Sequence, residues 1–251
     1  MVLAYQHPIV VIDTTDSTNL LAQEMLLSGT IGHGTVILAK NQLKGRGQRG
    51  NTWHSQESKN LTFSIVLFPP LFNIYRQFEL NQFISLAICD YLSTLDLKDI
   101  CVKWPNDVLV NGKKIAGILL ENSIRGEMVQ TVIAGIGLNV NQELFEESYN
   151  LPPTSLKLVT GNSFDLMVVL ENLLAIIMQR FHQLTTRNNA ILRNDYISLL
   201  YKLNESCILK SGEINWSGII RGIDESGWIM IEGPDGNLVS HSNTELKIMT
   251  T

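Results

Sequence analysis

The segment from Lys44 to Ser55 reads KGRGQRGNTWHS, and its residue types suit an anionic ligand. Its three glycines allow close approach of the backbone and positive φ angles at little steric cost. Arg46 and Arg49 carry planar donor groups that match phosphate or carboxylate oxygens, and Trp53 offers a flat ring that can cover an organic group. The segment therefore predicts an anion-binding loop, with a solvated surface loop as the alternative from these residues alone.

The charge distribution favours a binding loop. Positions 40–60 contain five basic residues and one acidic residue, so they carry +4, whereas the whole chain carries −5 and the remainder therefore −9. The low pI, near 5.5, argues against a nucleic-acid binder that works through a broad basic face. Positive charge is thus concentrated in one segment with no helical or strand periodicity, and long irregular segments inside compact domains are usually functional.

A second group of candidates follows a strand predicted at residues 102–104. Pro105 ends ladder hydrogen bonding in the sequence KWPND, so we expect Asn106 and Asp107 at a strand edge rather than inside the sheet. Lys114 begins an apolar strand at 115–121, where one ammonium group can meet an anionic oxygen in a low-dielectric site. The dipeptide Asn111-Gly112 just before it predicts a hairpin.

Glycines interrupt the strands that follow. Gly117, Gly135 and Gly137 lie within otherwise apolar runs, where each glycine weakens a strand. A ligand lying flat on the sheet would explain these glycines, and tight packing of a helix against the sheet is the alternative. The sequence DTTDSTN likewise has two interpretations, because Ser17 and Thr18 can cap the following helix, contact a ligand, or do both.

The elements that must position these residues are a mixture of helices and strands. Apolar runs predict further strands at 9–12, 35–39, 61–68 and 129–140, and helical spacing predicts helices after Asn19, over 77–95 and along 166–181. After Leu203, short β-rich pieces alternate with glycine turns. We therefore expect an α+β fold: a mostly antiparallel sheet with helices in residues 1–202, and a small β barrel or sandwich in residues 203–251.

Composition excludes several classes of protein. The chain is 45% apolar with a mean hydropathy of +0.10, which excludes global disorder. It has no apolar run of the roughly 18 residues needed to span a bilayer and no recognisable signal peptide. The three cysteines, Cys89, Cys101 and Cys207, fit neither a disulfide framework nor a zinc site. We expect reduced thiols in a cytoplasmic protein that does not bind membranes.

Five motifs together resemble the biotin protein ligase family. They are DSTN at 16–19, NQxxGRGQRGxxW at 41–53, KWPNDV from 103, KKIAGILLE from 113 and GIGLNVN from 135. They follow the order and compatible spacing of that family over most of the first 141 residues. The resemblance implies a catalytic domain like the class II aminoacyl-tRNA synthetase core and, less specifically, an SH3-like terminal domain.

The resemblance also implies an activity in two half-reactions. Biotin and Mg-ATP give biotinyl-5′-adenylate and pyrophosphate, and a lysine of a biotin carboxyl carrier protein (BCCP) domain then takes the biotinyl group and releases AMP. The cofactors implied are biotin, ATP and Mg²⁺, with the metal carried by ATP rather than by a protein site. A homodimer is expected by analogy with the family.

By motif position, the resemblance assigns the site residues. Those expected to act in catalysis are Arg46, Asp107 and Lys114. Those expected to bind biotin are Ser17, Thr18, Asn19, Gln42, Gly45, Arg46, Trp53, Lys114, Gly117 and Gly135. Those expected to bind ATP or the adenylate are Arg46, Gly47, Gln48, Arg49, Asn106 and Asn139. Asn106 and Asp107 orient either the ATP–metal side or the incoming lysine, and the sequence does not separate these roles.

Two departures from the family's pattern bear on function. Gln48 stands where a basic residue is common in relatives, so retention of the adenylate is expected to differ. Residues 1–12 leave no room for the N-terminal helix-turn-helix of the relatives that repress biotin-synthesis genes, so we expect no binding to operator DNA. Lipoate or octanoate transfer, a non-catalytic biotin sensor and a bifunctional ligase-repressor remain the alternatives.

Overall fold

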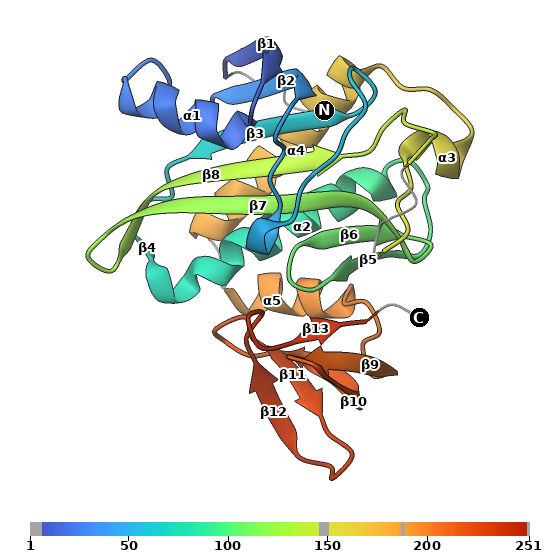
Figure 1. The fold of residues 1–251 in the computed structure, drawn as a ribbon. Helices are drawn as coiled ribbons and strands as arrows, with labels where there is room; N and C mark the ends of the chain where they lie inside the picture. The colour runs from blue at the N-terminus through green and yellow to red at the C-terminus, as the bar shows by residue number, and fades with distance from the viewer. Residues whose placement is uncertain (1–6, 146–150, 187–188, 250–251) are drawn as a thin grey trace.

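The computed structural model describes residues 7–145, 151–186 and 189–249 (Figure 1). An eight-stranded sheet forms its centre, with the strand order β1-β2-β3-β8-β7-β6-β5 and β4 paired to β8. The strands are β1 (Ile9–Thr15), β2 (Val36–Gln42), β3 (Leu61–Leu67), β4 (Phe72–Asn73), β5 (Ile100–Lys103), β6 (Asp107–Val110), β7 (Lys113–Arg125) and β8 (Met128–Leu138). Only the β1–β2 pair is parallel among the described strands, so the predicted mostly antiparallel sheet is confirmed.

Helices cover the two faces of this sheet unequally. The helices are α1 (Thr18–Leu27), α2 (Gln77–Ser93), α3 (Leu156–Thr160), α4 (Leu166–Thr186) and α5 (Asn189–Ser198). Strand residues alternate between faces: Phe63 and Ile65 of β3 belong to the large core beneath α2 and α4, whereas Val66 joins a small cluster beneath α1. Since α1 packs against β2, β3 and β8, the same face over β7 and β6 is left for another segment.

A second sheet follows α5 at the C-terminal end of the described chain (Figure 1). Its order is β12-β11-β10-β9-β13, formed by β9 (Ser206–Ser211), β10 (Ile214–Ile223), β11 (Ile229–Glu232), β12 (Leu238–His241) and β13 (Lys247–Ile248). All five strands fall in the β-rich region that the sequence predicts. Arg193 of α5 donates from Nη2 to the carbonyl oxygen of Ile223 at 2.6 Å, which joins this sheet to the helix above it.

The hairpin predicted at Asn111-Gly112 is confirmed, because both residues have positive φ angles, 51° and 70°, between β6 and β7. Strand β6 itself is not predicted by the sequence. Asp107 is its first residue and pairs with Lys103 on one side and Gly117 on the other, so the expectation that Asp107 lies at a strand edge is wrong. Asp107 and the apolar residues 108–110 continue the ladder as soon as the chain has turned at Pro105. No helix in the described part of the chain is long and apolar enough to cross a membrane.

Candidate active site

The predicted site residues gather at one pocket of about 110 Å³ on the sheet face that α1 leaves uncovered. Its walls come from the start of α1, the loop between β2 and β3, and strands β3, β6, β7 and β8. Most of the predicted residues line it: Ser17, Thr18, Asn19, Gln42, Arg46, Gly47, Gln48, Trp53, Asn106, Asp107, Lys114, Gly117 and Gly135. Segments far apart in sequence therefore form one site, as the motifs predict.

The loop between β2 and β3, residues 43–60, folds back on itself as a small irregular hairpin. The backbones of Arg46 and Thr52 form an isolated antiparallel β-bridge. The N–H of Trp53 donates to the carbonyl oxygen of Gly45 at 2.9 Å. Gly45 is required by close approach, because a Cβ there would lie 2.2 Å from the carbonyl oxygen of Trp53. Gly50, at φ 75°, is required by its conformation. The glycines thus serve the fold of the loop itself.

The ring of Trp53 lies over the glycines of β7 and β8. A Cβ on Gly137 would lie 2.2 Å from Trp53 Cε2, and one on Gly117 would lie 3.1 Å from Cζ3. Gly135 makes room for another side chain, since its Cβ would lie 2.4 Å from Asn19 Oδ1. In this structure the chain's own side chains fill the space that the sequence assigns to a flat ligand. The indole N–H of Trp53 is buried without a hydrogen-bond partner among the described residues.

Lys114 and Asp107 form an ion pair at the floor of the pocket. The two groups are 2.6 Å apart, with side-chain exposures of 27% and 21%. The Lys114 ammonium also lies 5.5 Å from the centre of the Trp53 ring, within reach of a cation–π contact. Nearby, burial lowers the pKa of Lys103, while the Asp107 carboxylate acts in the opposite direction. Within the pocket lining, the Lys114–Asp107 pair places one cation and one anion side by side.

Asn106 is held at the edge of the same floor. Its side-chain amide donates to the carbonyl oxygen of Ile118 at 2.8 Å, and the N–H of Ile118 donates back to the carbonyl oxygen of Asn106 at 3.0 Å. This reciprocal pair connects the turn before β6 to β7. Asn106 therefore keeps its place next to Asp107 without any ligand.

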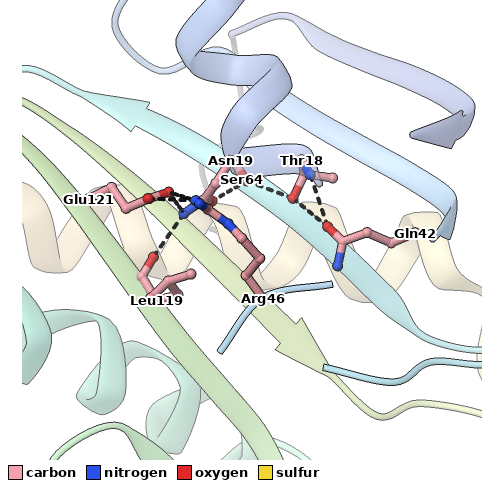
Figure 2. A network of polar contacts seen from close by, with 7 residues as sticks. All are labelled: Thr18, Asn19, Gln42, Arg46, Ser64, Leu119 and Glu121. Carbon is pink, nitrogen blue, oxygen red and sulfur yellow. Dashed lines mark hydrogen bonds and ion pairs between the residues drawn. The ribbon is translucent and has the colours of Figure 1, made fainter. Parts of the chain in front are cut away.

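A polar network forms the opposite wall (Figure 2). Gln42 Oε1 accepts from the N–H and the hydroxyl of Thr18, at 2.9 and 3.2 Å. The Ser64 hydroxyl lies 2.7 Å from Thr18 Oγ1 and 2.6 Å from Asn19 Oδ1. Ser17 occupies the N-cap position of α1, but its side chain makes no capping hydrogen bond. Ser17 therefore stands at the N-cap position, as the capping interpretation predicts, but its hydroxyl group does not cap the helix.

At the end of this network, Asn19 and Arg46 meet at Glu121 (Figure 2). Asn19 Nδ2 donates to Glu121 Oε2 at 2.8 Å, and Arg46 Nη2 lies 2.5 and 2.6 Å from the two carboxylate oxygens. The sequence motifs include Glu121 but assign it no role. Ser64 is also missed, although a serine inside the largely apolar run LTFSIVLF is the signal that could have identified it.

Three predicted residues lie outside the lining of this pocket. Gly45 lines a neighbouring hollow of about 360 Å³ on the other side of Trp53. Arg49 lies at the exposed tip of the loop with a φ of 58°. Asn139 is buried and donates from its side chain to the carbonyl oxygen of Thr154 at 2.9 Å. Asn139 thus fastens the segment after residue 151 to β8, and its predicted contact with the nucleotide stays a prediction.

The described residues contain no group of three or more His, Cys, Asp or Glu side chains arranged to hold a metal ion. Within the pocket lining, Asp107 is the one carboxylate, and it is already paired with Lys114.

Comparison with known proteins identifies the family. Residues 11–139 match the biotin/lipoate A/B protein ligase family. The chain is 35% identical over 230 residues to the biotin–[acetyl-CoA-carboxylase] ligase of Paracoccus denitrificans, covering 90% of this chain and 94% of that protein. It is 30% identical to the bifunctional ligase/repressor BirA of Bacillus subtilis (strain 168), covering 89% and 69% respectively. The chain belongs to the biotin/lipoate A/B protein ligase family.

The fold agrees with solved members. The biotin protein ligase from Aquifex aeolicus in complex with biotin and ATP superposes with a TM-score of 0.81 at 29% identity, covering 97% of this chain and 99% of that one. The ligand-free structure of the same protein gives a TM-score of 0.77. The likeness extends through both sheets, because almost the whole chain is covered.

Proposed function

We propose that the protein is a biotin protein ligase that activates biotin with Mg-ATP to biotinyl-5′-adenylate and transfers the biotinyl group to a lysine of a carboxylase carrier (BCCP) domain. The observation that carries this proposal is the convergence of Arg46, Lys114 and Asp107 on one pocket beneath a glycine-containing loop. The relatives named above as biotin ligases, and the solved relative with biotin and ATP, support the substrate pair.

The first half-reaction brings two anions together, so its rate depends on neutralising their charge. The Lys114 ammonium lies at the floor and the Arg46 guanidinium at the rim of the same pocket. We assign Lys114 to the carboxylate or acyl-phosphate oxygens and Arg46 to the phosphate side, with Gly47, Gln48 and Arg49 of the loop near the nucleotide. Mg²⁺, bound to the ATP phosphates, supplies further charge neutralisation when present.

Asp107 has two partners in this scheme. Its ion pair with Lys114 fixes the ammonium group in the ligand-free protein. When Lys114 turns to substrate oxygens, the carboxylate becomes free to orient the ammonium of the carrier lysine or to accept its proton. Asn106, held by Ile118, would align the same group. Thr18, Gln42 and Asn19 provide the polar contacts that we assign to biotin.

The loop must protect an acyl phosphate that hydrolyses easily, so water has to be excluded until the carrier arrives. At about 110 Å³, the pocket is smaller than the roughly 300–1,000 Å³ usual for ligand sites. The Trp53 ring occupies the space over Gly117 and Gly137 and so reduces the volume of the pocket. We infer that Trp53 shifts when biotin enters and then closes over the ligand as part of a lid.

Further features belong to the same proposal. We place a class II aminoacyl-tRNA synthetase-like catalytic domain in residues 1–202 and an SH3-like domain in residues 203–251. A cytoplasmic location fits the three free cysteines. A homodimer is compatible with β1, which lies at the end of the large sheet. No role in binding nucleic acid is proposed.

One experiment tests the function directly. The protein is incubated with biotin, Mg-ATP and a purified carrier domain, and the carrier is examined by mass spectrometry for the mass of one biotinyl group. Lipoate under identical conditions is the competing substrate, because the family includes lipoate ligases. Labelling by lipoate alone would overturn the biotin assignment. Biotin binding without biotin-dependent exchange of pyrophosphate into ATP would indicate a sensor.

A further inference from the structure

The Arg46–Glu121 pair joins a loop residue to a residue of the central sheet. Glu121 lies on β7 and faces the same side of the sheet as Gly117, four residues earlier, because strand residues alternate between faces. Glu121 therefore lies on the same face of β7 as the residues that form the floor of the pocket, next to that floor. Arg46 reaches it from the loop between β2 and β3 (Figure 2).

The contact uses only part of the guanidinium group. Arg46 Nη2 alone contacts both carboxylate oxygens, at 2.5 and 2.6 Å. Within the described chain, Nε and Nη1 of Arg46 make no hydrogen bond. If Glu121 blocked the anion-binding function of Arg46, its carboxylate would be expected to accept hydrogen bonds from two guanidinium nitrogens in a bidentate fork. The observed contact leaves donors for an anion while Glu121 remains bound.

Glu121 is the fixed member of the pair. Its Oε2 also accepts from Asn19 Nδ2 at 2.8 Å, and Asn19 Oδ1 lies 2.6 Å from the hydroxyl of Ser64 on β3. Asn19 and Ser64 are both buried, so the carboxylate is tied to α1 and, through it, to β3. Arg46 by contrast belongs to an irregular loop. The carboxylate therefore determines where the guanidinium group lies.

We propose that Glu121 is a positioning residue that holds Arg46, and with it the loop, over the pocket through one guanidinium nitrogen, leaving the other donors for the anionic substrate. The claim that Glu121 helps to retain the activated intermediate rests on the proposed function. The claim that Glu121 positions the loop does not depend on that function, since it concerns the ligand-free protein.

The first test measures the loop without any substrate. Trypsin cleavage after Arg49 is timed in the wild type, Glu121→Gln, Arg46→Gln, the double variant and Asp13→Asn. Glu121→Gln keeps an acceptor for Asn19 but removes the charge that holds Arg46, so cleavage is expected to be about tenfold faster, as a contact with a charged partner predicts. Asp13 is the matched control, because it pairs at 2.7 Å with Lys40 beside the same loop but lies outside the pocket. Its variant should cleave at the wild-type rate.

The double variant separates positioning from a general loss of structure. If Glu121 acts through Arg46, adding Glu121→Gln to Arg46→Gln changes the cleavage rate no further. Equal thermal midpoints for Glu121→Gln and the control exclude unfolding as the cause. Wild-type cleavage rates in Glu121→Gln, slower cleavage, or a full additional effect in the Arg46→Gln background would each overturn the proposal.

The second test concerns the ligand. Release of biotinyl-adenylate formed on the protein is expected to be about tenfold faster in Glu121→Gln, with the KM for ATP in pyrophosphate exchange raised, because Arg46 is assigned to the phosphate side. An unchanged release rate in an active enzyme would overturn the assignment to the intermediate. A wild-type protein that shows no biotin-dependent exchange would instead refute the proposed function and leave the cleavage test to decide the role of Glu121.

Discussion

The indole N–H of Trp104 donates a hydrogen bond of 2.9 Å to the carbonyl oxygen of Gly227, in buried surroundings. Trp104 lies two residues before Asn106, whereas Gly227 lies in the turn between β10 and β11 of the C-terminal sheet. The Tyr196 hydroxyl of α5 donates to the carbonyl oxygen of Pro105 at 3.3 Å. The C-terminal part of the chain thus supports the segment that carries Asn106 and Asp107 into the pocket.

Replacing Trp104 by Phe should weaken this support. The change leaves a buried carbonyl oxygen without its donor, which costs about 1–3 kcal/mol. We expect the free energy of unfolding in urea to fall by that amount and pyrophosphate exchange to slow. Trp216→Phe is the control, because the indole N–H of Trp216 makes a long hydrogen bond of 3.5 Å to Ser211, inside the C-terminal sheet. Equal losses in both variants would contradict a special role for Trp104.

Gly227→Ala should be more damaging than a comparable substitution elsewhere. Gly227 has a φ of 82°, and a Cβ there would lie 2.0 Å from Cγ of Phe78. Gly236 has a similar φ of 78°, but a Cβ added there would have nothing within 4 Å. Gly236→Ala therefore reports the backbone strain alone, about 1 kcal/mol, and Gly227→Ala should cost about 1–3 kcal/mol more. Thermal unfolding of the two variants gives the difference.

Gly137→Ala should displace Trp53 from the sheet. The added methyl group would occupy the position of the indole ring, and strand β8 is less able to move than a loop side chain. We expect a red-shifted tryptophan emission in the ligand-free protein and weaker retention of biotinyl-adenylate. Gly126→Ala, in the β7–β8 turn with open space around it, serves as the control. Unchanged emission in Gly137→Ala would contradict the position of Trp53.

Gln48→Arg should slow the release of the activated intermediate. Gln48 lines the pocket, so an arginine there adds a cation close to the adenylate phosphate. The expected change is about a tenfold lower release rate in stopped-flow measurements, as one charged hydrogen bond predicts. Identical release rates in the two proteins would refute the idea that this position controls retention.

The cysteines should react slowly in the folded protein. Burial raises the pKa of the Cys101 thiol to about 11, with Asp99 adding to the effect, and burial likewise raises the pKa values of Cys89 and Cys207. At pH 8 only about 0.1% of Cys101 is then thiolate, the nucleophilic form. Alkylation by iodoacetamide, followed by mass spectrometry, should be slow in buffer and fast in urea. Rapid alkylation of Cys101 in buffer would contradict its burial.

The sequence allowed local structure, and the gathering of the motif residues at one pocket, to be predicted where the residue types themselves decide. Asn111-Gly112 specifies its turn by two residues that tolerate positive φ, and the motifs around Lys114 and Arg46 converge as expected. Strand β6 was missed because four residues after a proline carry too little periodicity to separate a strand from a turn. Its existence moves Asp107 from an edge into the sheet.

Contacts between residues far apart in the sequence account for the features of the structure that the sequence did not predict. No pattern within the sequence indicates that Trp53 lies on Gly137, far along the chain, or that Asn19 fills the space at Gly135. A glycine in a strand signals close approach without identifying what approaches. Glu121 was missed for the same reason, since its partners come from two other motifs.

The floor of the pocket consists of β7 and β8, which also run through the middle of the large sheet. A substitution that reshapes this floor therefore changes packing on which folding depends, whereas the loop at 43–60 contributes few buried side chains. Sequence variation among descendants of this chain should accumulate in the loop, while the strands beneath it stay nearly constant.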